Sequence, residues 1–331
     1  MVRAVLFDEL GGPEVLRIHD LPIGEPGPGE LRIRVDAIGL NRGEALFRRG
    51  SYYELPELPA SRIGTESAGV VEAVGAGVDG FAPGDAVCTL PAFSMRDYGV
   101  YAERAIVPAR AVLHRPDGLD AVTAAAVWTA YVTAYGALVD VARLGAGDTV
   151  LITAAASTVG LAAIQVANHL GAVPIATTRA GAKRRRLLDA GAAEVIVTGE
   201  DDLVQRVLDA TGGRGAELAF DCVAGPGIHE LARAVVPDGR LIVYGWLDEG
   251  PVPLPLRPDF RGVDTRFHAM FDISTDPERL RRAERFITAG LRSGSFRPHV
   301  DRTFDLDEIT EAHRRLESDR QFGKIVATVR H

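Results

Sequence analysis

Residues 147–167 read GDTVLITAAASTVGLAAIQVA, and this stretch indicates the fold of a large part of the chain. It begins as a short apolar run typical of a buried strand and continues, after a small-residue turn, as the predicted helix Val159–Leu170. A generic GxGxxG phosphate loop would place its glycines at Ala155, Ser157 and Gly160. The match is weak on its own, but small residues still let the backbone approach a pyrophosphate at a helix N-terminus.

The same alternation of short strands and longer helices continues as far as residue 244. This order is typical of a doubly wound parallel sheet, which turns the weak motif into a good candidate for a dinucleotide site. We expect further strands at Val173–Thr177, Glu194–Val197, Leu218–Asp221 and Arg240–Tyr244. We expect helices at Ala121–Leu138, Ala182–Ala190, Asp202–Thr211 and Ile228–Val235.

The first third of the chain has a different pattern, with short β-rich segments separated by Gly- and Pro-rich turns. This pattern is typical of a small barrel with one short helix, Asn41–Gly50. Strands are predicted here at Val2–Phe7, Leu31–Ile38 and Gly69–Val74. Beyond the parallel sheet we expect helices Asp276–Ala289 and Asp305–Glu317 and a last strand, Lys324–Val329.

Composition excludes several classes of protein. Of 331 residues, 47% are hydrophobic and 25% charged, as in a soluble globular protein. The net charge of −8 lacks the basic footprint of a nucleic-acid binder. The N-terminal stretch has no apolar signal region, and no apolar run approaches the roughly 20 residues that span a bilayer. We therefore expect a cytoplasmic protein with no nucleic-acid or membrane partner.

The second strand of the parallel sheet bears on which dinucleotide binds. NAD sites usually have an acid about 20 residues after the loop, whereas this strand ends in Thr178 and Arg179, with Lys183 following. A Thr/Arg/Lys cluster suits the 2′-phosphate of NADPH, with Arg179 forking or stacking and Lys183 acting as a point charge. The alternative is a solvated basic helix face, which Arg185 and Arg186 fit. Lys183 also stands out because the chain has only two lysines, the other being Lys324, among 37 basic residues.

The chain resembles the medium-chain dehydrogenase/reductase superfamily, in its zinc-independent quinone oxidoreductase-like branch. The resemblance rests on N-x-x-E-x-x-x-R-x-G-x-Y at Asn41–Tyr52, GTESAGVVEAVGAGVDGFAPGD at 64–85, GVYAE at 99–103, WTAYVTAY at 128–135, the block at 147–167 and FGKIV at 322–326. It implies an α/β protein with a GroES-like β-barrel catalytic domain from 1–120 and 265–331. It also implies a doubly wound Rossmann domain from 121–264, with the cofactor in the cleft and a homodimer as the assembly.

The positions that bind zinc in the alcohol dehydrogenases of this superfamily hold other residues here. Asn41 stands where those enzymes have a cysteine, and Gly64-Thr65-Glu66 replaces their GHE motif. With only two cysteines, Cys88 and Cys222, a zinc site is not expected. Without a Lewis acid, hydride transfer to an alcohol or simple ketone is disfavoured. Reduction of a quinone or of an activated C=C bond needs no metal.

Two residues are candidates for the chemistry. The resemblance to enoyl-thioester reductases of the superfamily makes Tyr52 a candidate acid that protonates the developing enolate, although Tyr52 packing against the cofactor is an equal alternative. Asn41 is a candidate hydrogen-bond donor to the substrate or the nicotinamide ribose. Its alternative role is to cap the helix that follows it.

The predicted cofactor contacts come from the loop motif, the second strand and the segments that the resemblance brings to the cofactor. They are Thr129, Ser157, Thr158, Val159, Thr178, Arg179, Lys183, Val223, Tyr244, Gly245, Phe271 and Lys324. Aromatic residues expected near the cleft indicate a planar or bulky unsaturated substrate. They are Phe93, Tyr98, Tyr101, Trp128, Tyr131, Trp246, Phe267 and Phe271.

Three functions follow. The first is an NADPH-dependent, zinc-independent reductase that transfers hydride to a quinone or to the activated C=C of a conjugated carbonyl, with a small unsaturated molecule as substrate. The second is an enoyl reductase that performs a tailoring step in a biosynthetic pathway. The third is a non-catalytic NADPH-binding protein, either a sensor or a crystallin-like structural protein.

Overall fold

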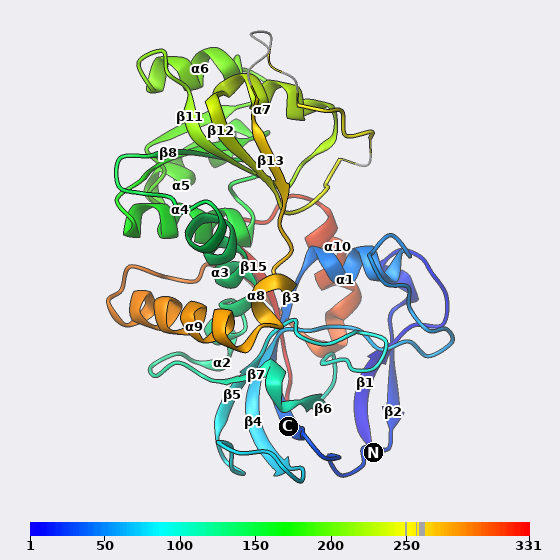
Figure 1. Cartoon of the computed structure of the whole chain (residues 1–331). Coiled ribbons are helices and arrows are strands. Elements are labelled where there is room, and N and C mark those ends of the chain that lie inside the picture. The colour runs from blue at the N-terminus through cyan, green and yellow to red at the C-terminus, as the bar shows by residue number, and fades with distance from the viewer. Residues whose placement is uncertain (249, 256, 258–261) are drawn as a thin grey trace. The chain divides into compact units, whose positions relative to one another are not determined.

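The computed structural model describes residues 1–248, 250–255, 257 and 262–331. It divides into two compact units, each treated by itself below (Figure 1). The antiparallel unit comprises Met1–Thr129, Ser274–Glu278 and Pro298–His331. The parallel unit comprises Ala130–Ile273 and Arg279–Arg297.

The parallel unit is built on a six-stranded sheet in the order β10-β9-β8-β11-β12-β13, with every pairing parallel. Its strands are β8 (Thr149–Ile152), β9 (Val173–Thr178), β10 (Glu194–Val197), β11 (Ala216–Asp221), β12 (Val235–Val243) and β13 (Asp264–Phe267). Strand order reverses between β8 and β11, which is where doubly wound sheets bind their ligands. The predicted parallel sheet is confirmed, although β13, with no buried residue, was not predicted.

Helices supply the apolar layers against this sheet, and their buried residues pack on Leu151, Ile175, Ile196 and Leu241 of its strands. Side-chain caps define where two of the helices begin. The helices are α3 (Trp128–Tyr135), α4 (Thr158–His169), α5 (Arg184–Asp189), α6 (Leu203–Ala210), α7 (Ile228–Ala234), α8 (Phe271–Ser274) and α9 (Pro277–Arg292).

The antiparallel unit holds a seven-stranded sheet in which β15, near the C-terminus, pairs antiparallel with β3. The order is β14-β15-β3-β4-β5-β7, with β6 on β3, and β1 and β2 form a separate pair. The strands are β1 (Val2–Leu6), β2 (Arg17–Leu21), β3 (Glu30–Leu40), β4 (Ser67–Val74), β5 (Ala86–Thr89), β6 (Arg104–Pro108), β7 (Val112–His114), β14 (Val300–Asp305) and β15 (Lys324–Thr328). Its helices are α1 (Arg42–Arg48), α2 (Ala121–Ala124) and α10 (Ile309–Glu317).

The predicted single helix Ala121–Leu138 is divided into α2, α3 and a π-helical turn at Gly136–Val141. The turn begins at Gly136, where a Cβ would lie 2.6 Å from Cε1 of His268, so the buried imidazole requires a glycine. The segment Ala121–Val141 is long and apolar enough to cross a membrane by length and composition alone, but most of it is buried within the fold. It is therefore a core segment.

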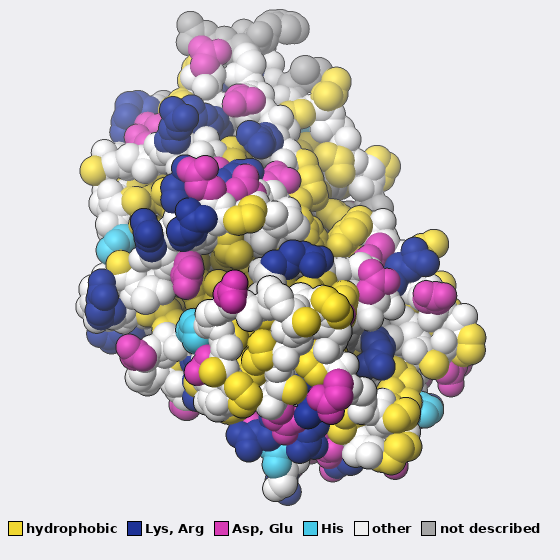
Figure 2. Space-filling view, turned by 60° about the horizontal axis from the view of Figure 1, so that its bottom comes forward, with side chains coloured by type: hydrophobic (Ala, Val, Ile, Leu, Met, Phe, Trp, Pro, Cys, Tyr) yellow, Lys and Arg dark blue, Asp and Glu magenta, His cyan; other side chains and the backbone are white. Residues whose placement is uncertain are grey.

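On the face in Figure 2, acidic and basic side chains are interspersed.

The pairing of β13 with β12 sets one boundary between the two units. Residues 265–331 were expected in the barrel domain, whereas β13 pairs with β12 and lies in the parallel unit. Most of α9 also lies in that unit, where Arg279 donates to Asp140. The exposed sequence of β13 carries no apolar alternation that would have indicated this extension.

Candidate functional site

The carboxyl edge of the parallel sheet carries most of the predicted cofactor contacts. Ser157, Thr158 and Val159 follow β8; Thr178 and Arg179 end or follow β9; Val223 follows β11; Tyr244 and Gly245 follow β12; and Phe271 follows β13. Because the ends of parallel strands share one edge, these residues from separate parts of the chain meet at the expected ligand edge.

The predicted phosphate loop, between β8 and α4, is fixed by a side-chain cap and a close backbone contact. Ser157 caps α4, its hydroxyl accepting the Gly160 N–H at 3.1 Å. A Cβ at Gly160 would lie 2.6 Å from the Cα of Ala155, so only glycine lets the helix begin this close to the turn. The amides of Thr158 and Val159 precede the first intrahelical bond and point along the positive end of α4. This geometry fits a pyrophosphate.

Asp221, which the sequence analysis did not single out, holds the neighbouring loop. Its buried carboxylate accepts from the Thr153 hydroxyl at 2.6 Å and from the backbone amides of Val223 at 3.1 Å and Ala224 at 2.7 Å. These bonds join the end of β8 to the loop after β11. An acid that ends an otherwise apolar strand is the signal that could have revealed it.

Tyr244 and Gly245 form the next part of this edge. The Tyr244 ring stacks on Phe220, with centroids 4.1 Å apart, and burial raises the pKa of its phenol well above the ordinary value. A Cβ at Gly245 would lie 3.2 Å from the Cβ of Cys222, so a side chain here would require Cys222 to shift slightly. Tyr244 therefore stays protonated at neutral pH.

The basic cluster after β9 comprises Arg179, Lys183 and Arg184. Arg184 donates to the Val195 carbonyl at 2.8 Å and pairs with Asp201 at 3.0 Å. Arg179 is exposed and Lys183 partly exposed. An acid also lies nearby, since a Cβ at Gly181 would be 3.1 Å from a carboxylate oxygen of Glu200. The cluster therefore combines three basic residues with a nearby carboxylate.

A second set of residues lies in the antiparallel unit, around a buried ammonium. Lys324 Nζ donates to Asn41 Oδ1 at 2.6 Å and to Glu66 Oε2 at 2.5 Å, and Lys324 and Glu66 are 1% and 0% exposed. The other oxygen of Glu66 accepts the Thr129 N–H at 2.9 Å. Gly39 makes room, because a Cβ there would lie 2.7 Å from Lys324 Cε. Three predicted residues, Asn41, Thr129 and Lys324, therefore meet around Glu66.

Glu44 completes this group, which we call the buried charge network: Asn41, Glu44, Glu66 and Lys324. Glu44 Oε2 accepts the backbone N–H of Asn41 at 2.5 Å, half of a capping box at the start of α1. Burial raises the pKa of Glu44 to about 7, against the opposing effect of the Lys324 charge. Glu44 was not among the predicted site residues, although the N-x-x-E spacing of a capping box contains it.

Tyr52 lies in the same unit, beside the start of α1. Its ring packs edge-on to Phe47 and against Tyr53, and its hydroxyl oxygen would lie 3.3 Å from a Cβ at Gly43. Burial raises the pKa of the Tyr52 phenol well above the ordinary value. The phenol therefore stays protonated across the physiological range and can act as a hydrogen-bond donor.

The aromatic residues expected around the substrate divide into two groups. Phe93, Tyr101, Trp128 and Tyr131 are buried side chains of the core. Partial or full exposure is retained by Tyr98, Trp246, Phe267 and Phe271.

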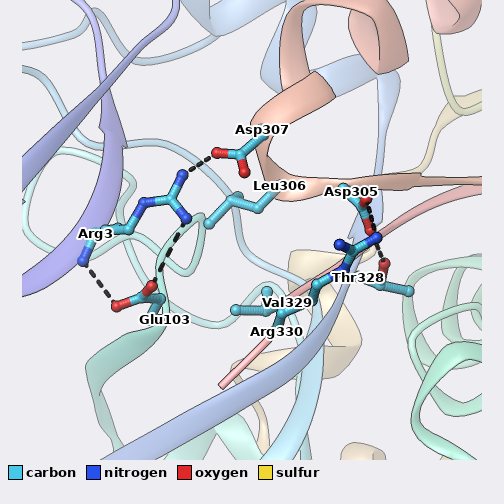
Figure 3. A pocket seen from close by; sticks show the side chains of 8 residues that line it. All are labelled: Arg3, Glu103, Asp305, Leu306, Asp307, Thr328, Val329 and Arg330. Atoms are coloured by element: carbon cyan, nitrogen blue, oxygen red, sulfur yellow. Dashed lines mark hydrogen bonds and ion pairs between the residues drawn. The ribbon is translucent and has the colours of Figure 1, made fainter.

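A surface pocket in the antiparallel unit shares no residue with the buried charge network (Figure 3). Its charged walls are already paired: Arg3 contacts Glu103 and Asp307, and Arg330 pairs with Asp305. Thr328 also donates to Asp305, at 3.2 Å. These mutual contacts leave the pocket little polar capacity for a ligand.

Comparisons with known proteins identify the kinds of domain that the chain contains. The family described as "Alcohol dehydrogenase GroES-like domain" matches residues 27–117, and that described as "Zinc-binding dehydrogenase" matches 190–326. The predicted combination of a GroES-like domain with a Rossmann sheet is thereby confirmed.

Full-length relatives are more specific. A quinone oxidoreductase from Pseudomonas aeruginosa is 33% identical over 98% of this chain and 99% of its own. A 2-haloacrylate reductase from a Burkholderia species is 28% identical over 98% of both chains. The crystal structure of Escherichia coli quinone oxidoreductase complexed with NADPH has a TM-score of 0.91 at 28% identity, covering 98% of this chain and 99% of that one.

The residues present do not fit the zinc that one family description names. Among the residues that the structure describes, no group of three His, Cys, Asp or Glu side chains is arranged to hold a metal. The oxygens of Asn41 and Glu66 instead accept from the Lys324 ammonium. The Lys324 ammonium therefore already uses the side-chain oxygens that a metal ion at Asn41 and Glu66 would need as ligands.

Lys324→Met tests the energetic role of this ammonium. The change leaves Glu66 and Glu44 buried without their cation, and we expect the antiparallel unit to lose roughly 3–5 kcal/mol of unfolding free energy. Adding Glu66→Gln should restore part of the loss, because the uncompensated charge is removed. Calorimetry of the thermal transitions measures both effects.

The matched control is Arg330→Met, which removes an exposed cation from the same end of the chain. Its effect should stay within about 0.5 kcal/mol. A Lys324→Met protein as stable as this control would contradict the role given to the buried ammonium.

Proposed function

The chain belongs to the medium-chain dehydrogenase/reductase superfamily, in its quinone oxidoreductase-like branch, and on that premise we propose that it is an NADPH-dependent reductase of quinones or conjugated carbonyls. Membership makes the chain an oxidoreductase. The proposal adds the cofactor, the class of acceptor and the residues that act on each.

The observation that carries the proposal is the identity of the groups around Asn41. Their oxygens accept from an ammonium, and in the described part of the chain no cluster of His, Cys, Asp or Glu is arranged to hold a metal that would polarise an alcohol or a ketone. Acceptors whose own conjugation stabilises the negative charge suit hydrogen-bond donors alone. Quinones and α,β-unsaturated carbonyls are such acceptors.

We assign each cofactor group to residues of the parallel unit. The Thr158 and Val159 amides would receive the pyrophosphate, and Arg179 and Lys183 the 2′-phosphate. Thr178, Val223, Tyr244, Gly245 and Phe271 would line the rest of the dinucleotide. When bound, reduced nicotinamide supplies the hydride.

In the antiparallel unit we assign the substrate side of the reaction. Tyr52 would donate a hydrogen bond, and then a proton, to the developing enolate or hydroquinone anion, because its phenol remains protonated. Asn41 would donate to the substrate or to the nicotinamide ribose. Thr129 and Lys324 remain predicted cofactor contacts, with the added role of holding Glu66.

The relatives support this class of acceptor. One is named for quinones and another for 2-haloacrylates, which contain a conjugated C=C bond. A tailoring enoyl reductase uses the same chemistry on another substrate and is the second candidate. A non-catalytic NADPH-binding protein is the third, and the cytoplasm is the proposed location for all three.

The proposed activity is tested by following NADPH absorbance with a panel of quinones, enones and enoyl thioesters. We expect oxidation with at least one class and no effect of a metal chelator. Tyr52→Phe should lower kcat by roughly 10²-fold or more, the usual contribution of a proton donor. Tyr53→Phe, which changes the exposed neighbouring tyrosine, is the control.

No turnover across the panel would favour the non-catalytic alternative. Unchanged kcat for Tyr52→Phe, with chemistry rate-limiting, would remove the proton-donor role.

Lys183→Ala tests the choice of cofactor. Loss of a charge-assisted contact to the 2′-phosphate should weaken NADPH binding by roughly 10- to 100-fold and leave NADH binding nearly unchanged. Titration calorimetry with both dinucleotides measures this. The control, Arg185→Ala, removes a cation already paired with Asp189. Equal losses for NADPH and NADH would argue against a phosphate contact.

We also propose a homodimer that forms through β13. This strand lies at the end of the parallel sheet, and all four of its residues, including the large apolar Phe267, are exposed. An exposed edge strand that carries an apolar side chain is a template for pairing with a second copy across a two-fold axis.

Phe267→Arg should separate the dimer, because it places a charge in the paired edge. Light scattering after gel filtration should give twice the 35.3 kDa chain mass for the wild type and a single chain for the variant. Val173→Arg, at an exposed apolar site on β9, should remain dimeric. A monomeric wild type would overturn the proposed assembly.

A further inference from the structure

The end of β9 lacks the acid that accepts the ribose 2′-hydroxyl in sites for NADH, but the next strand of the sheet runs directly beside it. β9 ends at Thr178, and Arg179 follows. β10 pairs with β9 in parallel, with Val197 opposite Thr178, and the Thr198 N–H donates to the Thr178 carbonyl at 3.0 Å. The segment that follows β10 therefore begins at the end of β9.

A tight turn after β10 brings Glu200 to the turn that carries the proposed phosphate-binding cations. The Glu200 N–H donates to the Val197 carbonyl at 2.9 Å, so the chain folds back on the end of its own strand. Oε1 of Glu200 would lie 3.1 Å, and Oε2 3.7 Å, from a Cβ at Gly181. Gly181 stands midway in sequence between Arg179 and Lys183. An exposed carboxylate therefore rests against the backbone that joins these two cations.

Glu200 is the first of three consecutive acids, and the other two have structural roles. The Asp201 carboxylate accepts the Val197 N–H at 2.8 Å and pairs with Arg184 at 3.0 Å, which fixes the turn after β10 to the start of α5. Asp202 caps α6 by accepting a backbone N–H at 3.0 Å. Glu200 is the acid of the three whose carboxylate lies against the turn after β9.

The two nicotinamide dinucleotides would respond to this carboxylate in opposite ways. A 2′-phosphate carries between one and two negative charges at neutral pH, and a carboxylate nearby repels it. A ribose 2′-hydroxyl is a hydrogen-bond donor, and a carboxylate accepts from it. The same side chain therefore weakens the binding of NADPH and strengthens that of NADH.

We propose that Glu200 is a specificity-determining residue for the cofactor: it supplies, from the strand next to β9, the acid that β9 itself lacks. Arg179 and Lys183 favour NADPH, and Glu200 limits that preference by repelling the 2′-phosphate and by accepting the 2′-hydroxyl of NADH. This inference rests on the proposed placement of the 2′-phosphate at Arg179 and Lys183.

Glu200→Gln tests the proposal by titration calorimetry with NADPH and with NADH. Loss of the negative charge should tighten NADPH binding roughly fivefold, the effect of one unit charge a few ångströms away in a water-like dielectric. Loss of the charged acceptor should weaken NADH binding by roughly three- to tenfold. The control is Asp209→Asn, which removes an exposed carboxylate from the other end of α6 and should change neither affinity.

Salt dependence separates charge repulsion from a change in shape. Between about 0.05 M and 1 M salt the Debye length falls from more than 10 Å to about 3 Å, so repulsion between exposed charges is screened. The gain in NADPH affinity of Glu200→Gln over the wild type should shrink accordingly. A gain that stays the same at high salt would overturn the role given to the Glu200 charge.

Three binding results would overturn the proposal: unchanged affinities for both dinucleotides, equal changes for both, or weaker NADPH binding by Glu200→Gln. The last would mean that Glu200 orients the cations and does not oppose the phosphate. Lys183→Ala distinguishes this failure from a failure of the proposed cofactor site. If Lys183→Ala weakens NADPH alone while Glu200→Gln changes nothing, only the role of Glu200 is refuted. If Lys183→Ala does not affect NADPH, the placement of the 2′-phosphate is wrong and the inference is refuted with it.

Discussion

The buried pair of Lys324 and Glu66 is the interaction on which the site in the antiparallel unit depends. β15 carries Lys324 to β3 by antiparallel pairing, and Gly39 on β3 leaves space for the lysine stem. Glu66 then joins this ammonium to the Thr129 backbone and to the Asn41 amide. Residues from both ends and the middle of the chain are thereby held around one positive charge.

Such a group is expensive to bury, and stability alone is a weak reason to keep it, because apolar residues of similar volume often pack equally well. A network of two acids, one cation and one amide has a property that an apolar core lacks. It can exchange a proton with little rearrangement, since Thr65 can accept where it previously donated. The same charges that orient Asn41 also bring Glu44 close to neutral titration.

Local pattern was sufficient to predict much of the fold, because β8, α4 and β9 each combine the right periodicity with turn or cap residues. The glycine requirement at Gly160 also followed from the loop motif. β13 could not be predicted, since its exposed residues carry no apolar alternation. The partners of Lys324 were missed for a different reason. A contact across 258 residues depends on the pairing of β15 with β3, and sequence spacing does not encode that pairing.

The measurement that tests this account most directly is NMR of the two ammonium groups in protein labelled with [¹⁵N]lysine, assigned by Lys183→Ala. The buried, doubly bonded Lys324 ammonium should retain its protons long enough to give a resolved signal, while the ammonium of partly exposed Lys183 exchanges with water much faster. Glu66→Gln should shift the Lys324 signal and speed its exchange. If both ammonium groups exchange at the same solvent-limited rate, Lys324 does not organise the site.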